Sequence, residues 1–410
     1  MKAERAGLGG LAVVLSILAG VLIVVNVYKV SADMPLLMAD APSGFGIGEG
    51  AAGILMAVID YIGVLLALPA GIIVMRINAQ RTVIIALACG IIGALVGALT
   101  MSYWVMLVSR LIEGIAYVLV SVAAPALILA WVKPEKRGLP MAIWSCYMGI
   151  GMFIVFTSAQ MFSNWQALWW ACAFALAAIL LLVLLFCRLP KQGYDDGEDD
   201  GEASAAEGFK SLPTWMLGLS CVFFCFCAAS VAAFCPTYCV RVLGLESDAA
   251  NMLASLFTIG TIIGALIMGV LFNKVTALKQ RIVVFVVSMA IALAVSFLYF
   301  NYSESMAIPV LLISGIVLQM APATAFTLVA DTVSKPALIG IASAILAMTM
   351  GFGGVLTTAT GFIIELSGWG ALTAVCVVSG AIGLALAFVF RITMKSRVPG
   401  AASDGGADTP

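Results

Sequence analysis

The sequence contains no histidine and very few charged residues. Charged side chains account for 10 % of its 410 residues, whereas apolar side chains account for 63 %. The absence of histidine excludes a histidine proton relay. A soluble domain of this length needs far more charge on its surface, and the mean hydropathy of +1.15 points the same way. The composition therefore predicts an all-α protein that crosses a membrane many times.

Motifs for metal binding, nucleotide binding and catalysis are also missing. Five of the ten cysteines lie in one apolar segment without a CxxC pair, at Cys221, Cys225, Cys227, Cys235 and Cys239. That spacing favours packing over metal ligation. There is no GxxxxGK[ST] loop, so direct use of ATP is not expected, and the scattered carboxylates argue against an intramembrane enzyme. We expect no enzymatic activity, no cofactor, no metal and no nucleic-acid partner.

Twelve apolar stretches are long enough to cross a lipid bilayer, because about 20 helical residues span a hydrocarbon core of roughly 30 Å. They lie near residues 8–37, 49–75, 81–101, 104–132, 138–162, 165–187, 213–240, 248–273, 280–300, 305–331, 337–365 and 368–392. No small-residue cleavage site follows the first stretch, so we expect a span there and not a cleaved signal. With a cytoplasmic N-terminus, 17 of the 20 Lys and Arg residues lie in the cytoplasm. The positive-inside rule then predicts that both termini are cytoplasmic in the inner membrane.

The longest interruption divides these spans into six and six. Residues 188–212 contain the acidic run from Tyr194 to Glu202, a composition typical of a solvated, mobile linker. We therefore predict an N-terminal six-helix bundle at 1–187, an acidic cytoplasmic linker at 188–212, a C-terminal six-helix bundle at 213–392 and a disordered cytoplasmic tail at 393–410.

The two halves repeat each other at an interval close to 200 residues. Four residues recur at the same place relative to their spans: Pro35 as Pro236, Gly71 as Gly269, Pro125 as Pro322 and Trp165 as Trp369. Four pairs in the same order indicate an internal duplication. Two bundles related in this way form a central cavity at mid-membrane, and rocking them exposes it to each side in turn.

Ionisable residues at membrane depth are the strongest functional signal. Arg110 and Glu113 lie in the fourth span, with Arg110 roughly 9 Å below the expected outer boundary at 1.5 Å of rise per residue. Lys29 lies at a similar depth in the first span, and Asp60 lies near the middle of the second. Charged groups in a membrane are costly and are usually functional.

Two hypotheses account for these residues. In the first, Arg110 binds a small anion with its planar fork, Lys29 adds a second positive charge, and Asp60 or Glu113 carries a coupled proton. In the second, Arg110 pairs with Glu113 and Asp60 in a structural ion network, while Lys29 extends outward to water. Further candidates for the cavity wall are Tyr28, Asn26, Trp144 and Tyr147. The second half offers only neutral polar residues at this depth, which suggests a small substrate held mainly by the N-terminal bundle.

Two segments of the sequence resemble the major facilitator superfamily. After the second span, Gly71, Arg76 and Arg81 match the glycine and basic residues of the family's conformational loop, whereas Met75 replaces its aspartate and Asn78 its second glycine. The fourth span matches the family pattern at Arg110, Glu113 and Gly114. With Pro125, Trp131 and the run Lys133 to Gly138, this segment resembles the branch of cyanate permeases and nitrate or nitrite porters.

The resemblance implies a monomeric twelve-helix secondary carrier in the lipid bilayer, which moves a small organic or inorganic anion by alternating access with proton or anion coupling. The fifth span lacks the Gly-Pro pair of proton-coupled drug exporters. Export of an apolar or cationic compound through Asp60 and Glu113 remains the alternative. A channel would show pore loops or rings of charge, and a sensor would carry a soluble domain.

Overall fold

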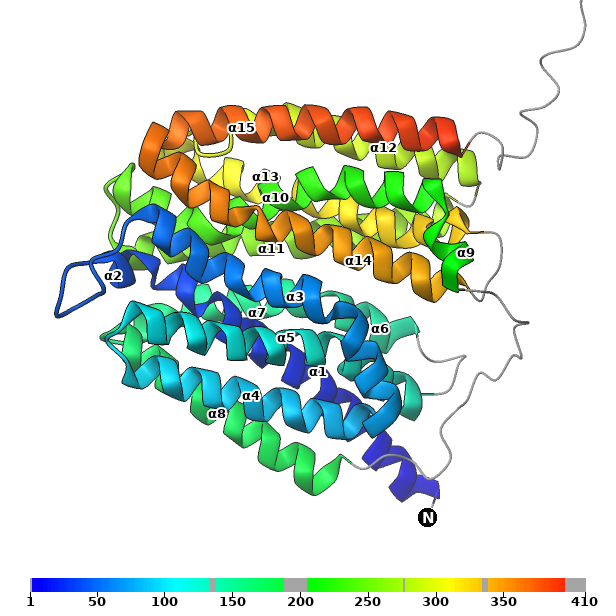
Figure 1. Cartoon of the computed structure of the whole chain (residues 1–410), viewed down its shortest axis with the longest axis horizontal. Coiled ribbons are helices and arrows are strands. Elements are labelled where there is room, and N and C mark those ends of the chain that lie inside the picture. The colour runs from blue at the N-terminus through cyan, green and yellow to red at the C-terminus, as the bar shows by residue number, and fades with distance from the viewer. Residues whose placement is uncertain (1, 133–137, 188–204, 276, 334–337, 395–410) are drawn as a thin grey trace, which may run out of the picture.

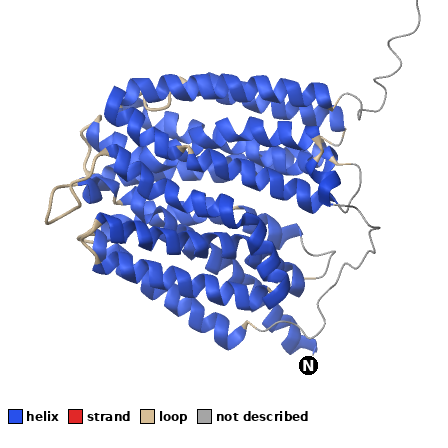
Figure 2. Ribbon diagram, in the orientation of Figure 1, coloured by secondary structure: helices blue, strands red, loops and turns tan. Residues whose placement is uncertain are grey.

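The computed structural model describes residues 2–132, 138–187, 205–275, 277–333 and 338–394. All regular secondary structure in these ranges is helical, as Figure 2 shows. The first half comprises α1 (Lys2–Ala32), α2 (Met34–Met38), α3 (Glu49–Ile77), α4 (Ala79–Leu99), α5 (Tyr103–Trp131), α6 (Gly138–Ser145), α7 (Tyr147–Ser158) and α8 (Trp165–Phe186). The second half comprises α9 (Ala205–Phe209), α10 (Leu212–Arg241), α11 (Ser247–Lys274), α12 (Leu278–Ser296), α13 (Glu304–Leu328), α14 (Ile339–Val355) and α15 (Thr357–Thr393).

The described helices agree with a fold of twelve membrane crossings. Ten helical segments are long and apolar enough to span a membrane by length and composition. The last of them, at residues 341–393, is long enough for two crossings, which meet at Gly368, where φ is +81°. The broken pair α6 and α7 supplies the remaining crossing. The predicted all-α membrane fold is thus confirmed.

Two predicted spans are interrupted. The stretch at 138–162 breaks at Cys146, between α6 and α7, and the stretch at 337–365 breaks at Leu356, between α14 and α15. Neither breaking residue is itself a proline or a glycine, although the pair Gly353 and Gly354 lies just before the second break. The two breaks lie 210 residues apart, close to the interval of the sequence repeat. The repeat therefore extends to local backbone irregularities.

Figure 1 shows the two halves as two groups of helices whose long axes run roughly in the same direction. The short helix α2 lies at one end of the molecule, which we call the α2 end, and the N-terminus lies at the other. Contacts between the halves are made mainly by α3 with α14 and α15, and by α7 with α11. Both broken helices therefore lie where the halves meet.

Several boundaries differ from those predicted. The first span ends at Ala32, because Asp33 interrupts the helix and α2 begins with Pro35 close to its start. Most of the acidic linker, 188–204, and most of the tail, 395–410, lie outside the described residues. The last part of the linker is not simply solvated: it forms α9, where Gly208 packs against Ile341 of α14.

Candidate functional site

Lys29, Arg110 and Glu113 form a buried ionic cluster between α1 and α5. Lys29 Nζ contacts Glu113 Oε1, and Arg110 Nη1 contacts Glu113 Oε2, so one carboxylate pairs with two cations. All three side chains are 0 % exposed. Removing Glu113 would leave two uncompensated positive charges in a medium of low dielectric constant, which is strongly unfavourable. The cluster carries a net charge of about +1 when all three groups are ionised.

Backbone carbonyls also accept hydrogen bonds from each nitrogen of the Arg110 guanidinium. Its Nε donates to the Leu55 carbonyl of α3 at 3.2 Å, and Nη2 donates to the Val27 carbonyl of α1 at 2.8 Å. A weaker contact of 3.4 Å joins Nη1 to the Asn26 carbonyl. Arg110 therefore joins α1, α3 and α5. Because the guanidinium donates to acceptors within the protein, it has no free pair of N–H groups that could bind an external anion.

Lys29 is held equally tightly. Its ammonium group donates to the Asn26 carbonyl at 2.9 Å and to Asn26 Oδ1 at 2.6 Å. It also lies 4.7 Å from the ring centroid of Trp169 in α8, a geometry that a cation and an indole favour. Lys29 therefore does not extend to water. The Asn26 amide nitrogen is buried without a hydrogen-bond partner, which makes it a free donor next to the cluster.

Asp60 differs from the other ionisable residues at membrane depth. Its carboxylate has no hydrogen-bond or ion-pair partner among the described residues, although it interacts electrostatically with Arg110. It faces the other half, because a Cβ atom added to Gly354 of α14 would lie 2.5 Å from Asp60 Oδ2. One residue on, the Tyr61 hydroxyl lies 3.4 Å from Thr358 Oγ1. Asp60 is thus an unpaired carboxylate at the junction of the halves, beside the break at Leu356.

Aromatic side chains surround the same region. Trp144 and Tyr147, on either side of the break at Cys146, stack with ring centroids 4.3 Å apart and an interplanar angle of 7°. Tyr28 and Tyr117 both interact electrostatically with Asp60 and with Tyr147. The structure therefore brings Asp60, Tyr28 and Tyr147 into one neighbourhood, with Trp144 packed behind Tyr147 against Gly20.

The predicted conformational loop is a tight turn between α3 and α4. Asn78 joins the two helices with a φ of 76° and a ψ of 158°, a backbone conformation that is populated almost only by glycine. The position therefore keeps the backbone geometry of the glycine in the family pattern although it carries a side chain. Asn78 Oδ1 also caps α4 by accepting from the Arg81 amide at 3.0 Å. Arg76 and Arg81 are partly or fully exposed, and Gly71 lies within α3.

Sequence reasoning missed the partners of these residues. It left Trp169, Leu55 and Thr358 out of the site, and no local pattern identifies a residue that touches Lys29 or Tyr61 from another helix. The ion network of the second hypothesis is present for Arg110 and Glu113. Asp60 takes no part in an ion pair in the described structure.

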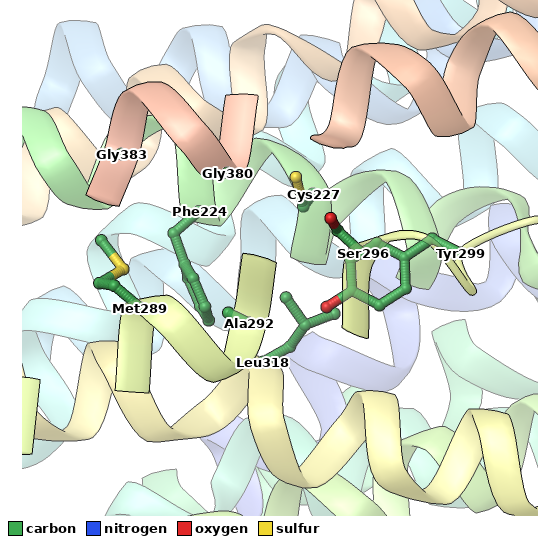
Figure 3. A pocket seen from close by; sticks show the side chains of 9 residues that line it. All are labelled: Phe224, Cys227, Met289, Ala292, Ser296, Tyr299, Leu318, Gly380 and Gly383. Atoms are coloured by element: carbon green, nitrogen blue, oxygen red, sulfur yellow. The ribbon is translucent and has the colours of Figure 1, made fainter. Parts of the chain in front are cut away.

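The second half has no comparable ionic cluster among its described residues. Ser255 and Thr258 of α11 donate to carbonyls of their own helix, and Asn251 donates to the Ala32 carbonyl of α1 at 3.1 Å. A cavity of about 10 Å³, enough for roughly one water molecule, lies between α10, α12, α13 and α15. Figure 3 shows its lining residues, among them Phe224, Met289 and Tyr299. All of them come from the second half, so this cavity is separate from the region around Asp60.

Comparison with known proteins decides the family. The family model of the Major Facilitator Superfamily matches residues 11–358. The chain belongs to the major facilitator superfamily. No curated protein matches the sequence. As expected for this superfamily, the protein is a multi-pass membrane transporter and not an enzyme.

Solved structures of superfamily members share the fold. A bacterial homologue of the human lysosomal transporter Spinster, in an inward-facing and occupied conformation, is 17 % identical with a TM-score of 0.72; the match covers 93 % of this chain and 96 % of that one. The nucleoside transporter NupG is 18 % identical with a TM-score of 0.70, over 94 % of this chain and 99 % of that one. At such identities the similarity concerns the fold alone.

Proposed function

We propose that this transporter is a monomeric, proton-coupled carrier of a small anion, with Asp60 as the group that binds the coupled proton. It works by alternating access in the inner membrane, with both termini in the cytoplasm and the α2 end outside. The observation that carries the proposal is the unpaired Asp60 carboxylate at the junction of the halves. A carboxylate in a medium of low dielectric constant binds a proton readily when no cation pairs with it.

Charge balance supports an anionic substrate. The cluster of Lys29, Arg110 and Glu113 carries about one positive charge in excess, and ionised Asp60 is its nearby counter-charge. When a proton neutralises Asp60, the positive charge is uncompensated. A monoanion that enters beside Asp60 restores the balance, so proton and anion favour each other's binding and move together.

The roles of the other candidates follow from their contacts. Lys29 and Arg110 attract the anion mainly through the electrostatic potential of their positive charges, because their donors already have acceptors within the protein. Direct contact with the anion requires Glu113 to release one of them. Asn26 offers its free amide nitrogen, and the Tyr28 hydroxyl offers a further donor near Asp60, with Tyr147 close to Tyr28. Small planar anions such as nitrate, nitrite, cyanate or formate fit this set of donors.

A second candidate has its own support. Asp60 has aromatic neighbours in Tyr28 and Tyr117, and a carboxylate among aromatic rings is also a typical site for an organic cation. In that case the protein exports a cationic compound in exchange for protons. The two candidates differ in the sign of the ligand charge, and they predict opposite effects of neutralising Asp60.

Ligand-induced thermal stabilisation of the purified protein distinguishes them. The probes are nitrate, formate and cyanate, with tetraethylammonium as the cation and uridine as the neutral solute. A ligand at 100 times its dissociation constant stabilises by about 2.7 kcal/mol.

We expect an anion to stabilise the wild type more at pH 5.5 than at pH 8. Asp60→Asn, which mimics the protonated acid, should keep the anion effect at both pH values, and the exposed-site control Asp248→Asn should behave as wild type. Stabilisation by tetraethylammonium alone, lost in Asp60→Asn, would favour the second candidate. No stabilisation by any anion would contradict the first.

A further inference from the structure

The N-terminus of α3 lacks a cap from its own segment. Gly48 occupies the N-cap position and has no side chain to accept a hydrogen bond. Instead, the Gly50 amide donates to Glu365 Oε2 of α15 at 2.8 Å. A side-chain acceptor for this amide is normally supplied by the N-cap residue itself. Here it comes from the other half of the molecule, 315 positions along the chain. We call this contact the inter-half cap.

Glycines make the inter-half cap sterically possible. A Cβ atom at Gly50 would lie 2.7 Å from both Glu365 Oε2 and the Phe362 ring, and one at Gly361 would lie 2.1 Å from the Glu49 carbonyl oxygen. No side chain fits at these distances. The first turns of α3 and the segment 361–365 of α15 are therefore in direct backbone contact, which places the carboxylate over the start of α3.

The charges at this contact are complementary. A carboxylate is favourable at a helix N-terminus, where the unpaired amides carry partial positive charge. A second pair joins the same helix start to the other half: Arg241, in the last turn of α10, lies 3.6 Å from Glu49. Glu365 and Arg241 are both exposed. Exposed contacts of this kind are weak, as a contact that must form and break in every transport cycle needs to be.

Other contacts between the halves gather at the same end. Ser31 Oγ lies 2.8 Å from the Ala232 carbonyl, and Asn251 donates to the Ala32 carbonyl. Neither pair touches Glu365 directly. The α2 end is therefore closed by at least three separate contacts between the halves, of which only the inter-half cap places a carboxylate on a helix terminus.

We propose that Glu365 is a latch residue that holds the α2 end closed by capping α3 from the opposite half. When the halves separate at this end, α3 loses its only side-chain cap, and the closed state is favoured by that difference. The inference rests on the alternating access of the proposed function. It is independent of the substrate and of Asp60.

Hydrogen-deuterium exchange of the purified full-length protein tests the latch without a substrate. The variants are Glu365→Ala, Glu365→Gln and the control Glu304→Ala, which removes an exposed carboxylate from the first turn of α13. Exchange rates report the population of opened states. We expect Glu365→Ala to speed exchange about two- to tenfold at residues 49–53, from the loss of a capping side chain. The same increase should appear in peptides covering 31–33 and 232–233, because the end opens as a unit.

Glu365→Gln should fall between wild type and alanine, since the amide oxygen still accepts a hydrogen bond but lacks the charge. Glu304→Ala should match the wild type. Faster exchange confined to residues 49–53 would overturn the proposal, because Glu365 would then be a local cap that does not control closure. Unchanged exchange in Glu365→Ala would overturn it as well. Neither result affects the case for a coupled proton on Asp60, which is tested by ligand binding.

Discussion

The two halves share a fold but differ in the charge of their buried polar side chains. The first half buries two cations and a carboxylate in contact, Lys29, Arg110 and Glu113. In the second half, the described buried polar side chains are neutral and bond mainly to helix backbone or to each other, as Ser230 bonds to Thr360 at 2.7 Å. A duplicated scaffold thus keeps its helix geometry while one copy alone carries the charge. Asp60 lies where the charged half meets the neutral one.

The ionic cluster should be the most sensitive part of the molecule. Glu113→Gln leaves Lys29 and Arg110 buried without a counter-charge, at a cost of about 3–5 kcal/mol. We expect the thermal midpoint of the purified protein to fall sharply, or the protein to fail to express. The exposed control Glu304→Gln should change stability by less than about 0.5 kcal/mol.

A compensated variant sharpens the same point. Replacing Lys29, Arg110 and Glu113 together by methionine removes all three charges, and such replacements of buried ion clusters are often neutral or stabilising. The triple variant should therefore be more stable than Glu113→Gln alone, yet lose any stabilisation by anions. If it is as unstable as Glu113→Gln, the lost hydrogen bonds and packing matter more than the unpaired charge.

A substitution at the contact between the halves beside Asp60 should lower stability by an intermediate amount. A methyl group at Gly354 would lie 2.4 Å from the Asp60 carboxyl carbon, and overpacking of this kind costs about 1–3 kcal/mol. Gly354→Ala should lower the thermal midpoint of the purified protein. It should also change how stabilisation by an anion depends on pH. Gly370→Ala is the matched control, because nothing lies within 4 Å of its added Cβ. Equal behaviour of the two variants would show that α14 can move away from Asp60 freely.

The neutral half should respond least to the loss of a polar group. Ser230→Ala removes the hydrogen bond to Thr360 between α10 and α15, and a neutral hydrogen bond contributes about 1 kcal/mol. Thermal unfolding should therefore show a small decrease. A loss as large as that of Glu113→Gln would remove the contrast between the halves.

Much of the fold could be predicted from the sequence, because membrane spans depend on long apolar runs that composition alone reveals. The halves were visible in pairs such as Pro125 and Pro322, both of which lie within helices at equivalent places. The breaks at Cys146 and Leu356 were not predicted, since neither residue is itself a proline or a glycine. The interruption of the first span at Asp33 was also missed.

The site was predicted less completely than the fold. Depth along the helices placed Lys29 and Arg110 at a similar level, and both contact Glu113 in the structure. Their partners could not be predicted, because the Leu55 carbonyl, Trp169 and Gly354 approach from helices whose rotation a sequence does not specify. For the same reason the sequence left open whether Asp60 joins the ion network, in which the structure pairs Glu113 with Lys29 and Arg110.

The central claim is that Asp60 carries the proton that moves with the substrate. Its most direct test measures proton entry into proteoliposomes loaded with a pH-sensitive dye, after addition of the anion that stabilises the protein most. We expect the wild type to acidify the lumen as the anion enters. Asp60→Asn should exchange labelled anion across the membrane but produce no acidification. Acidification by Asp60→Asn at the rate of the wild type would contradict the account.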